Sequence, residues 1–137
     1  MDKRAELVAL CDRFFDAIEA NDFAAIEACC GPEYVVWHSH DNLYEPRESN
    51  LPMLKRGTDS KSWKRYNNRR VMAFEGGFVQ QHDIWRQRED GTKWVKPVLF
   101  IAYVVNGKIS RIYEYFNRTP PGTLTHEPSK DSVEPNY

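Results

Sequence analysis

Three short turn motifs divide the second half of this chain into strand-like segments. The motifs are Glu75-Gly76-Gly77, Glu89-Asp90-Gly91-Thr92 and Asn106-Gly107, and the last is a strong signal for a type I′ hairpin turn. The segments that they separate span residues 69–74, 78–88, 94–105 and 109–117. Turns this short join antiparallel neighbours, so this half of the chain predicts a meander of three or four antiparallel strands.

The first thirty residues have helical spacing instead. One apolar stripe recurs at i, i+3, i+4 and i+7, formed by Leu7, Leu10, Cys11, Phe14, Phe15 and Ile18. Asn21 and Asp22 end that helix, and Asp22 can cap a second helix that runs to Cys30 and stops at Gly31-Pro32. A strand is expected over 34–38, a polar, turn-rich stretch over 40–46, and short helices over 47–56 and 58–65. Pro52 fits only near the first turn of such a helix.

Helices first and a strand meander later indicate the α+β class. We expect the N-terminal helices to pack on a strongly bent, mostly antiparallel sheet, giving a cone-shaped α+β barrel with one open mouth. A cone of this kind is a natural pocket for a small apolar ligand. Residues 1–117 form the expected domain, and residues 118–137 read as an extended, proline-rich C-terminal tail.

Composition excludes several functional classes. Hydrophobic residues are 41% and aromatic residues 13% of the 137, too many for a disordered chain. The formal net charge of −1 argues against a general nucleic-acid binder. No apolar run approaches the roughly 20 residues of a membrane span, and no secretory signal is visible, so we expect a cytoplasmic protein. The three cysteines form no CxxC motif, which favours buried free thiols in a reducing compartment.

Four local motifs carry a family resemblance. They are FFDAIEANDFAAIEACC at 14–30, VVWHSHDN at 35–42, GGFVQQHDIW at 76–85 and GKISRIYEYFN at 107–117. Over roughly residues 5–117 the chain resembles the SnoaL-like branch of the nuclear transport factor two-like superfamily. That superfamily includes ketosteroid isomerase, scytalone dehydratase, limonene epoxide hydrolase, polyketide cyclases, formaldehyde-releasing lyases and non-catalytic members. One fold with many chemistries means that the site must decide the function.

The two histidines of the expected strands are the first candidate catalytic groups. His38 ends the first strand, on one face with Val36 and His40, at a position that resembles that of the base carboxylate of ketosteroid isomerase. Imidazole titrates near pH 6.5 and can therefore give or take a proton at neutral pH. His82 lies mid-strand, where it either lines the cavity or faces solvent. The resemblance to limonene epoxide hydrolase favours the cavity.

An acidic and a phenolic residue complete the predicted machinery. Glu114 lies between Ile112 and Phe116 on one strand face, where a buried carboxylate without a partner would be costly. The resemblance implies that Glu114 orients or charge-balances a histidine, and the alternative is a solvent-facing glutamate. Tyr44 lies in the loop after His38, where its hydroxyl could donate to a developing oxyanion.

Further residues are expected to bind the substrate, and the aromatic ones suit a flat ligand. They are Phe14, Tyr34, His40, Trp63, Tyr66, Gln80, Phe100 and Ile112. The basic stretch over 55–70 either meets an anionic group at the pocket mouth or forms a solvated face. A metal site at His38, His40 and His82 is a weak reading, because no cysteine or aspartate lies at ligand spacing.

These features predict a cofactor-free acid–base lyase without a metal. Phe14 stands where ketosteroid isomerase has its oxyanion tyrosine, and His82 replaces one acidic member of the epoxide hydrolase set, so a histidine-rich cavity is closer to the dehydratase and the lyases. The expected reaction is dehydration or retro-aldol cleavage of a small hydrophobic, hydroxylated aromatic molecule, with His82 as the proton partner of His38. An isomerase or polyketide-type cyclase, and a non-catalytic ligand-binding domain, stay open. The resemblance also implies a homodimer packed through the outer face of the sheet.

Overall fold

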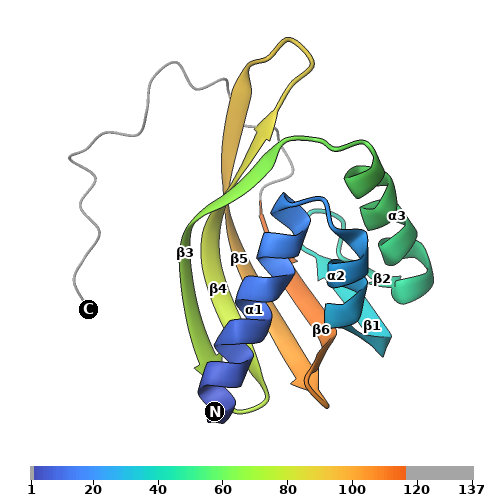
Figure 1. The fold of residues 1–137 in the computed structure, drawn as a ribbon. Coiled ribbons are helices and arrows are strands. Elements are labelled where there is room, and N and C mark those ends of the chain that lie inside the picture. Colours follow the sequence, from blue (N-terminus) through green and yellow to red (C-terminus); the bar gives the residue numbers. More distant parts are fainter. Residues whose placement is uncertain (1, 117–137) are drawn as a thin grey trace, which may run out of the picture.

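One curved sheet carries three helices on its concave side (Figure 1). The computed structural model describes residues 2–116, so the expected tail at 118–137 lies outside the described residues. The elements in chain order are α1 (Lys3–Glu19), α2 (Phe23–Cys29), β1 (Cys30–His38), β2 (Leu43–Pro46), α3 (Arg47–Asp59), β3 (Lys64–Phe74), β4 (Gly77–Gln87), β5 (Lys93–Val105) and β6 (Lys108–Tyr115).

The sheet has six strands in the order β2-β1-β6-β5-β4-β3. The meander from β3 to β6 is antiparallel throughout, as predicted, and β1 joins the far side of β6 in parallel. The α+β class and the mostly antiparallel sheet are therefore confirmed. The strands β2 and β3 stay at opposite edges, so the sheet forms an open, curved cone wall rather than a closed barrel.

Both N-terminal helices begin at an aspartate cap, of which the cap at Asp22 was predicted. The Asp2 carboxylate accepts a hydrogen bond from the backbone N–H of Ala5, and Asp22 does the same for Ala25. Between them Asn21 adopts a positive φ of 55°, which breaks the helix. The second helix ends at Cys29, earlier than expected, because Cys30, Gly31 and Pro32 already belong to β1.

The segment from residue 40 to 65 differs most from expectation. Part of the predicted turn region is the short strand β2, and a single helix, α3, includes Pro52 in its interior instead of near its first turn. The helix expected over 58–65 does not form. Tertiary contacts explain this, because the Lys64 ammonium donates to Asn21 and the Tyr66 N–H donates to Glu19 at 2.6 Å. These bonds draw the segment into β3, which pairs with β4.

Glycines close the three predicted turns. Gly76, Gly91 and Gly107 all have positive φ, and Asn106 joins Gly107 in the left-handed region, as a type I′ turn requires. Next to the first turn, Gly77 lies so close to β5 that an added Cβ would stand 2.1 Å from the Ala102 carbonyl oxygen. The sheet can approach itself here only because that residue has no side chain.

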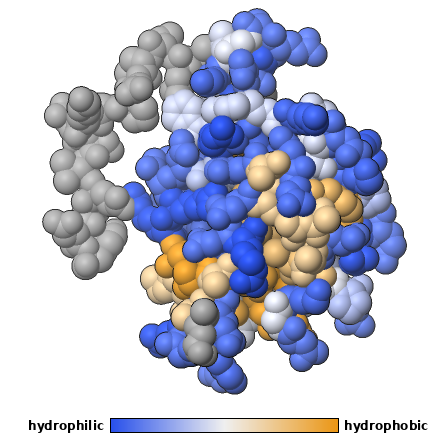
Figure 2. All heavy atoms as spheres, viewed as in Figure 1, coloured by the Kyte–Doolittle hydropathy of each residue, from blue (hydrophilic) through white to orange (hydrophobic). Residues whose placement is uncertain are grey.

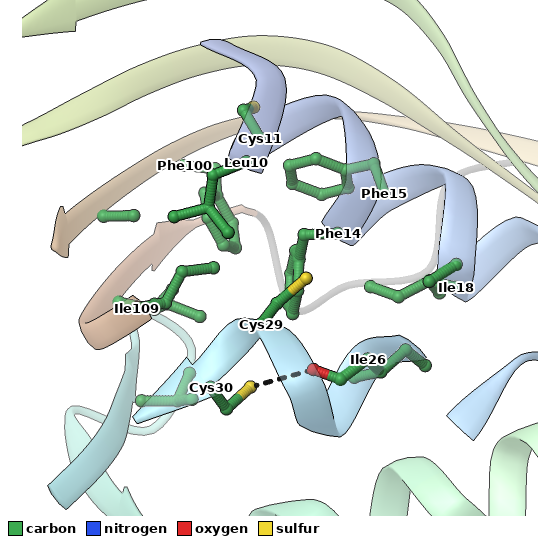
Figure 3. Packing of buried hydrophobic residues seen from close by; sticks show 14 of the residues in the cluster. Leu10, Cys11, Phe14, Phe15, Ile18, Ile26, Cys29, Cys30, Phe100 and Ile109 are labelled. Carbon is green, nitrogen blue, oxygen red and sulfur yellow. Dashed lines mark hydrogen bonds between the residues drawn. The ribbon is translucent and has the colours of Figure 1, made fainter. Parts of the chain in front are cut away.

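The apolar stripe of α1 packs against the concave face of the sheet. Figure 3 shows side chains of α1 meeting those of α2, β5 and β6, and the Cys30 thiol pointing to the Ile26 carbonyl at 3.4 Å. All three cysteines are free and buried, as predicted. The largest fully buried apolar side chains are Phe15, Phe78, Ile26, Ile109 and Ile112. The helical side of the molecule is otherwise mostly polar, with apolar residues gathered at the lower left and across the middle to the right of the view (Figure 2).

The convex face of the sheet carries an exposed aromatic layer. Its rings form a continuous chain of contacts with centroid distances between 5.0 and 6.3 Å. Its members are Trp37, Tyr44, Tyr103, Tyr113 and Tyr115. No helix within residues 2–116 is long and apolar enough to cross a membrane.

Candidate functional site

The strands β1 and β6 run in parallel and finish together, at the end of the sheet where the β4–β5 hairpin projects (Figure 1). In this register His38 is the direct partner of Glu114. The Ser39 hydroxyl fixes the junction, since it accepts from the Phe116 N–H at 2.9 Å and donates to the Phe116 carbonyl at 3.0 Å. We call this region, formed by His38, His40, Glu114 and Phe116, the β6 end of the concave face.

Two half-buried imidazoles lie together at the β6 end. The rings of His38 and His40 are 5.4 Å apart, and each contacts the Phe116 ring, at 6.0 and 5.0 Å. Burial, followed by the proximity of His40, lowers the pKa of His38. His38 is therefore mainly uncharged at neutral pH and can accept a proton.

Glu114 is a half-buried carboxyl whose burial raises its pKa to about 7, against the opposing effect of Arg86 and Lys96. A carboxyl with this pKa can both donate and accept a proton near neutral pH. Within residues 2–116 its side chain makes no hydrogen bond or ion pair with a histidine. The described contacts therefore give no support to its predicted role as the group that holds an imidazole.

Two cations and several aromatic rings surround the carboxyl. By strand alternation Arg86 shares the concave face of β4 with His82, and Lys96 shares the concave face of β5 with Phe100. The Lys96 ammonium lies 4.9 Å from the ring centre of Phe116 and 5.3 Å from that of Trp94. At the edge of this region, Arg65 and Lys93 stack on Trp63 at 5.2 and 4.6 Å.

His82 lies deep in the core and is only 1% exposed. The Cys11 thiol donates to Gln80 Oε1 at 3.2 Å, and the Gln80 amide nitrogen is 3.0 Å from His82 Nδ1. Because that nitrogen is a donor, Nδ1 accepts and the ring proton resides on Nε2. Burial, followed by the charge of Arg69, lowers the pKa of His82 to about 4, so the ring is neutral. Its Nε2 has no partner within residues 2–116.

The predicted dyad of His38 and His82 is not brought together. Their strands, β1 and β4, are separated by β6 and β5, which is roughly 14 Å along the sheet at about 4.8 Å per strand. The ring of His82 contacts Phe15, Tyr66 and Phe100 instead, at 4.9, 5.2 and 6.4 Å. A neutral, enclosed imidazole whose Nδ1 already accepts from Gln80 is a hydrogen-bonding group rather than a base.

Most predicted substrate-binding residues lie on the concave face, where they form core. Buried members are Phe14, Tyr34, Tyr66, Gln80, Phe100 and Ile112, whereas His40 and Trp63 are half-buried near the β6 end. The Phe14 ring contacts Phe15 at 5.3 Å and Phe100 at 5.9 Å, and Phe78 stacks on Phe100. These rings occupy the cone beside His82, whereas the side chains of the β6 end are half-buried.

Tyr44 is not part of this region. It belongs to β2, where it pairs with Trp37, and alternation turns both side chains to the convex face. Its side chain is 56% exposed and hydrogen-bonds to Tyr113. The expected loop at this position is a strand, so the hydroxyl that was predicted to donate to a developing oxyanion lies on the face away from the β6 end.

Comparison with known proteins matches this architecture to solved structures alone. No family model and no curated protein matches the sequence. An "LEH-like" epoxide hydrolase from M. tuberculosis superposes with a TM-score of 0.74 at 16% identity, covering 85% of this chain and 86% of that one. The chain has the nuclear transport factor two-like fold. A candidate polyketide cyclase from Xanthomonas campestris pv. campestris gives 0.71 at 19% identity, covering 85% and 93%. A nuclear transport factor two-like protein of unknown function from Burkholderia pseudomallei gives 0.68 at 9% identity, covering 82% and 92%.

The opposite end of this nuclear transport factor two-like fold holds an open groove of about 1040 Å³. It lies between the start of α1 and the β3–β4 and β5–β6 turns. Its apolar lining comes from Leu7, Leu10, Phe74 and Val104, and Lys3, Arg4, Glu6, Arg13 and Glu75 also line it. None of the predicted site residues lines this groove.

Sequence reasoning missed the two cations that face Glu114. The signal was present, because alternation from His82 places Arg86 on the concave face, and alternation from Phe100 does the same for Lys96. Their chemistry is that of anion binding. Within residues 2–116 no group of three histidine, cysteine or acidic side chains is arranged to hold a metal ion.

Proposed function

We propose that this protein is an enzyme that removes and returns a proton during elimination on a small, hydrophobic, hydroxylated aromatic molecule. The observation that carries the proposal is the register pairing of His38 with Glu114, both half-buried, at the β6 end of the concave face. An imidazole whose pKa burial lowers, next in register to a carboxyl whose pKa burial raises to about 7, supplies a proton acceptor and a proton donor near neutral pH. The proposed class is a lyase that uses no cofactor.

The pair supports two eliminations. In a dehydration, His38 takes the proton from the carbon next to a carbonyl, the carbon–oxygen bond of the β-hydroxyl breaks, and Glu114 gives its proton to the departing oxygen, which leaves as water. In a retro-aldol cleavage, His38 takes the proton of the β-hydroxyl, the carbon–carbon bond breaks to release a small aldehyde, and Glu114 protonates the enolate carbon. A positioned acid or base of this kind contributes about 10²–10⁴-fold.

The second candidate function is an isomerase or polyketide-type cyclase, in which the same groups move a proton from one atom of the substrate to another. The similarity in fold to a candidate polyketide cyclase favours this alternative. The same two residues would act, and only the product would differ. The third candidate, a non-catalytic ligand-binding domain, is supported by the apolar groove far from the histidines.

The assembly that we propose is a homodimer joined through the exposed aromatic layer. Tyr44, Tyr103 and Tyr115 are each more than two-fifths exposed there, beside the exposed Leu99. Contiguous exposed aromatic surface of this kind is typical of an interface between proteins. The free, buried thiols suit a reducing cytoplasm, which is the compartment that we propose.

The test is turnover of a panel of hydroxylated aromatic β-hydroxyketones by the full chain, compared with His38→Ala and Glu114→Gln. Each substitution should lower kcat/KM about 10²-fold or more. The matched control is Tyr44→Phe, on the convex face, which should retain full activity. Unchanged turnover in both site variants would remove the mechanism, and binding of the panel without turnover would favour the ligand-binding domain.

A further inference from the structure

Two half-buried cations near the β6 end, Arg86 and Lys96, form no ion pair with any acid that the structure describes. The ion pairs within residues 2–116 involve Lys55, Arg69 and His40, and neither Arg86 nor Lys96 is among them. Both cations interact electrostatically with the carboxyl of Glu114. Because burial raises the pKa of this carboxyl to about 7, it is partly protonated at neutral pH and neutralises their charge only in part. Among the described residues, Arg86 and Lys96 are therefore two cations that share one partly protonated carboxyl.

Aromatic rings, rather than an acid, hold the ammonium of Lys96. Lys96 lies over Trp94 and Phe116, so its ammonium is fixed by ring faces that take none of its N–H donors. Trp63 is stacked with Lys93 and Arg65 in the same manner. Donors positioned in this way stay available to an anion, and the rings offer flat apolar surface beside them.

We infer that the substrate of this site carries a carboxylate on an aromatic ring, with the carboxylate bound by Arg86 and Lys96 and the ring lying against Trp94 and Phe116. That the bound molecule is a substrate rests on the proposed function, but its binding to this site does not require turnover. A guanidinium and an ammonium together match a planar carboxylate, since the guanidinium supplies paired donors and the ammonium a point charge. The bound anion would also place its ring next to the Glu114 carboxyl.

The charges around Glu114 give the binding a pH signature. The groups that influence it or lie next to it are His38 and Tyr34 from β1, Tyr66 from β3, Arg86 from β4 and Lys96 from β5. When Glu114 ionises, it competes with the ligand for both cations and repels its carboxylate. Affinity for an anionic ligand should therefore fall as the pH rises through about 7.

The probes are benzoate, neutral benzamide of the same shape, and acetate, each titrated calorimetrically into the full chain at low salt. Benzoate should bind about tenfold or more tightly than either of the other two, because a charged hydrogen bond and ring contact act together. Arg86→Met and Lys96→Met should each weaken benzoate about tenfold and leave benzamide unchanged. Arg86→Lys and Lys96→Arg should restore most of the loss, and they show that the fold tolerates substitution at these positions.

Lys55→Met is the matched control, because it removes one positive charge from α3 and should leave benzoate binding unaltered. Equal affinity for benzoate and benzamide in the unmodified protein would overturn the inference, as would an equal loss in the control. The proposed function fails separately. If the panel is not turned over while benzoate discrimination persists, the anion site stands without the lyase, and turnover of neutral ketones without that discrimination sinks only the anion site.

Discussion

His38 and Glu114 are direct neighbours across the parallel pairing of β1 and β6, and Phe100 is the partner of Glu114 on the other side. The carboxyl therefore lies in a row between an imidazole and a buried aromatic ring. Apolar surroundings on one side favour its protonated form, while Arg86 and Lys96 oppose that effect. Burial of the Glu114 carboxyl therefore destabilises the fold when the group is ionised, and it also gives the group a pKa near neutrality.

Glu114→Gln should make the protein more stable in alkali. The folded-state pKa is about 7 and the ordinary value is 4.5, so the folded protein binds more protons between these values. The free energy of unfolding consequently falls as the pH rises from 4.5 to 7, by an amount on the order of 3 kcal/mol. A glutamine at this position does not titrate, so the variant lacks this pH-dependent loss of stability. Urea unfolding should give the variant the higher midpoint at pH 8 and an equal midpoint at pH 4, and equal midpoints at both pH values would contradict this account.

His82 should be found as the Nε2–H tautomer and should stay neutral down to about pH 5. Its folded-state pKa of about 4 lies below the ordinary 6.5, so the unfolded chain binds more protons in between, and stability is lost as the pH falls through that window. Nitrogen-15 NMR of labelled histidine checks the tautomer directly. His82→Gln should reduce proton uptake on unfolding at pH 5 by about one, and a ring that titrates near 6.5 would refute the assignment.

Two glycine substitutions should change stability in opposite directions. Gly77→Ala forces a Cβ to within 2.1 Å of the Ala102 carbonyl oxygen and 2.7 Å of the Phe74 ring, so it should cost about 3 kcal/mol. Gly57→Ala lies in α3 with no atom within 4 Å of the added carbon, and it should stabilise by about 0.5–1 kcal/mol. Thermal unfolding of both variants is the measurement. A neutral Gly77→Ala would mean that β4 and β5 are less closely paired there.

A charge in the aromatic layer should separate the proposed dimer. Tyr103→Arg places a guanidinium among the exposed rings of β5 and β6, where it would be desolvated by a second copy. Light scattering should give twice the chain mass for the unmodified protein and the single mass for the variant. Met53→Lys, an equally exposed position on α3, is the control and should stay dimeric. A monomeric unmodified protein would end this proposal.

The strands that follow short turns could be predicted well from sequence, because glycine and asparagine at positive φ fix the hairpins locally. The helix caps at Asp2 and Asp22 act over three residues and are equally visible. The early start of β3 could not be predicted, because it depends on the contact between Lys64 and Asn21, which are 43 residues apart in the chain. Local patterns cannot report an anchor of that kind.

The candidate site was predictable only in part. Alternation showed which neighbours share a face with His38, His82 and Glu114, and the family resemblance favoured the cavity side for His82. The distance between His38 and His82 depends on strand order, which local spacing does not contain. Tyr44 was assigned to a loop, and a four-residue strand reversed the direction of its side chain. The relay from Cys11 through Gln80 to His82 joins α1 to β4 and becomes visible only when both elements are placed.

The parallel insertion of the last strand beside the first constrains how the chain is made. The Ser39 hydroxyl bonds to a residue 77 positions later, and β1 has no partner toward the sheet centre until β6 is present. On a ribosome the nascent helices and β1 must therefore wait, with apolar surface uncovered, until residue 115 has left the exit tunnel. Slow synthesis of the 60–108 region should lengthen that vulnerable interval and increase dependence on chaperones.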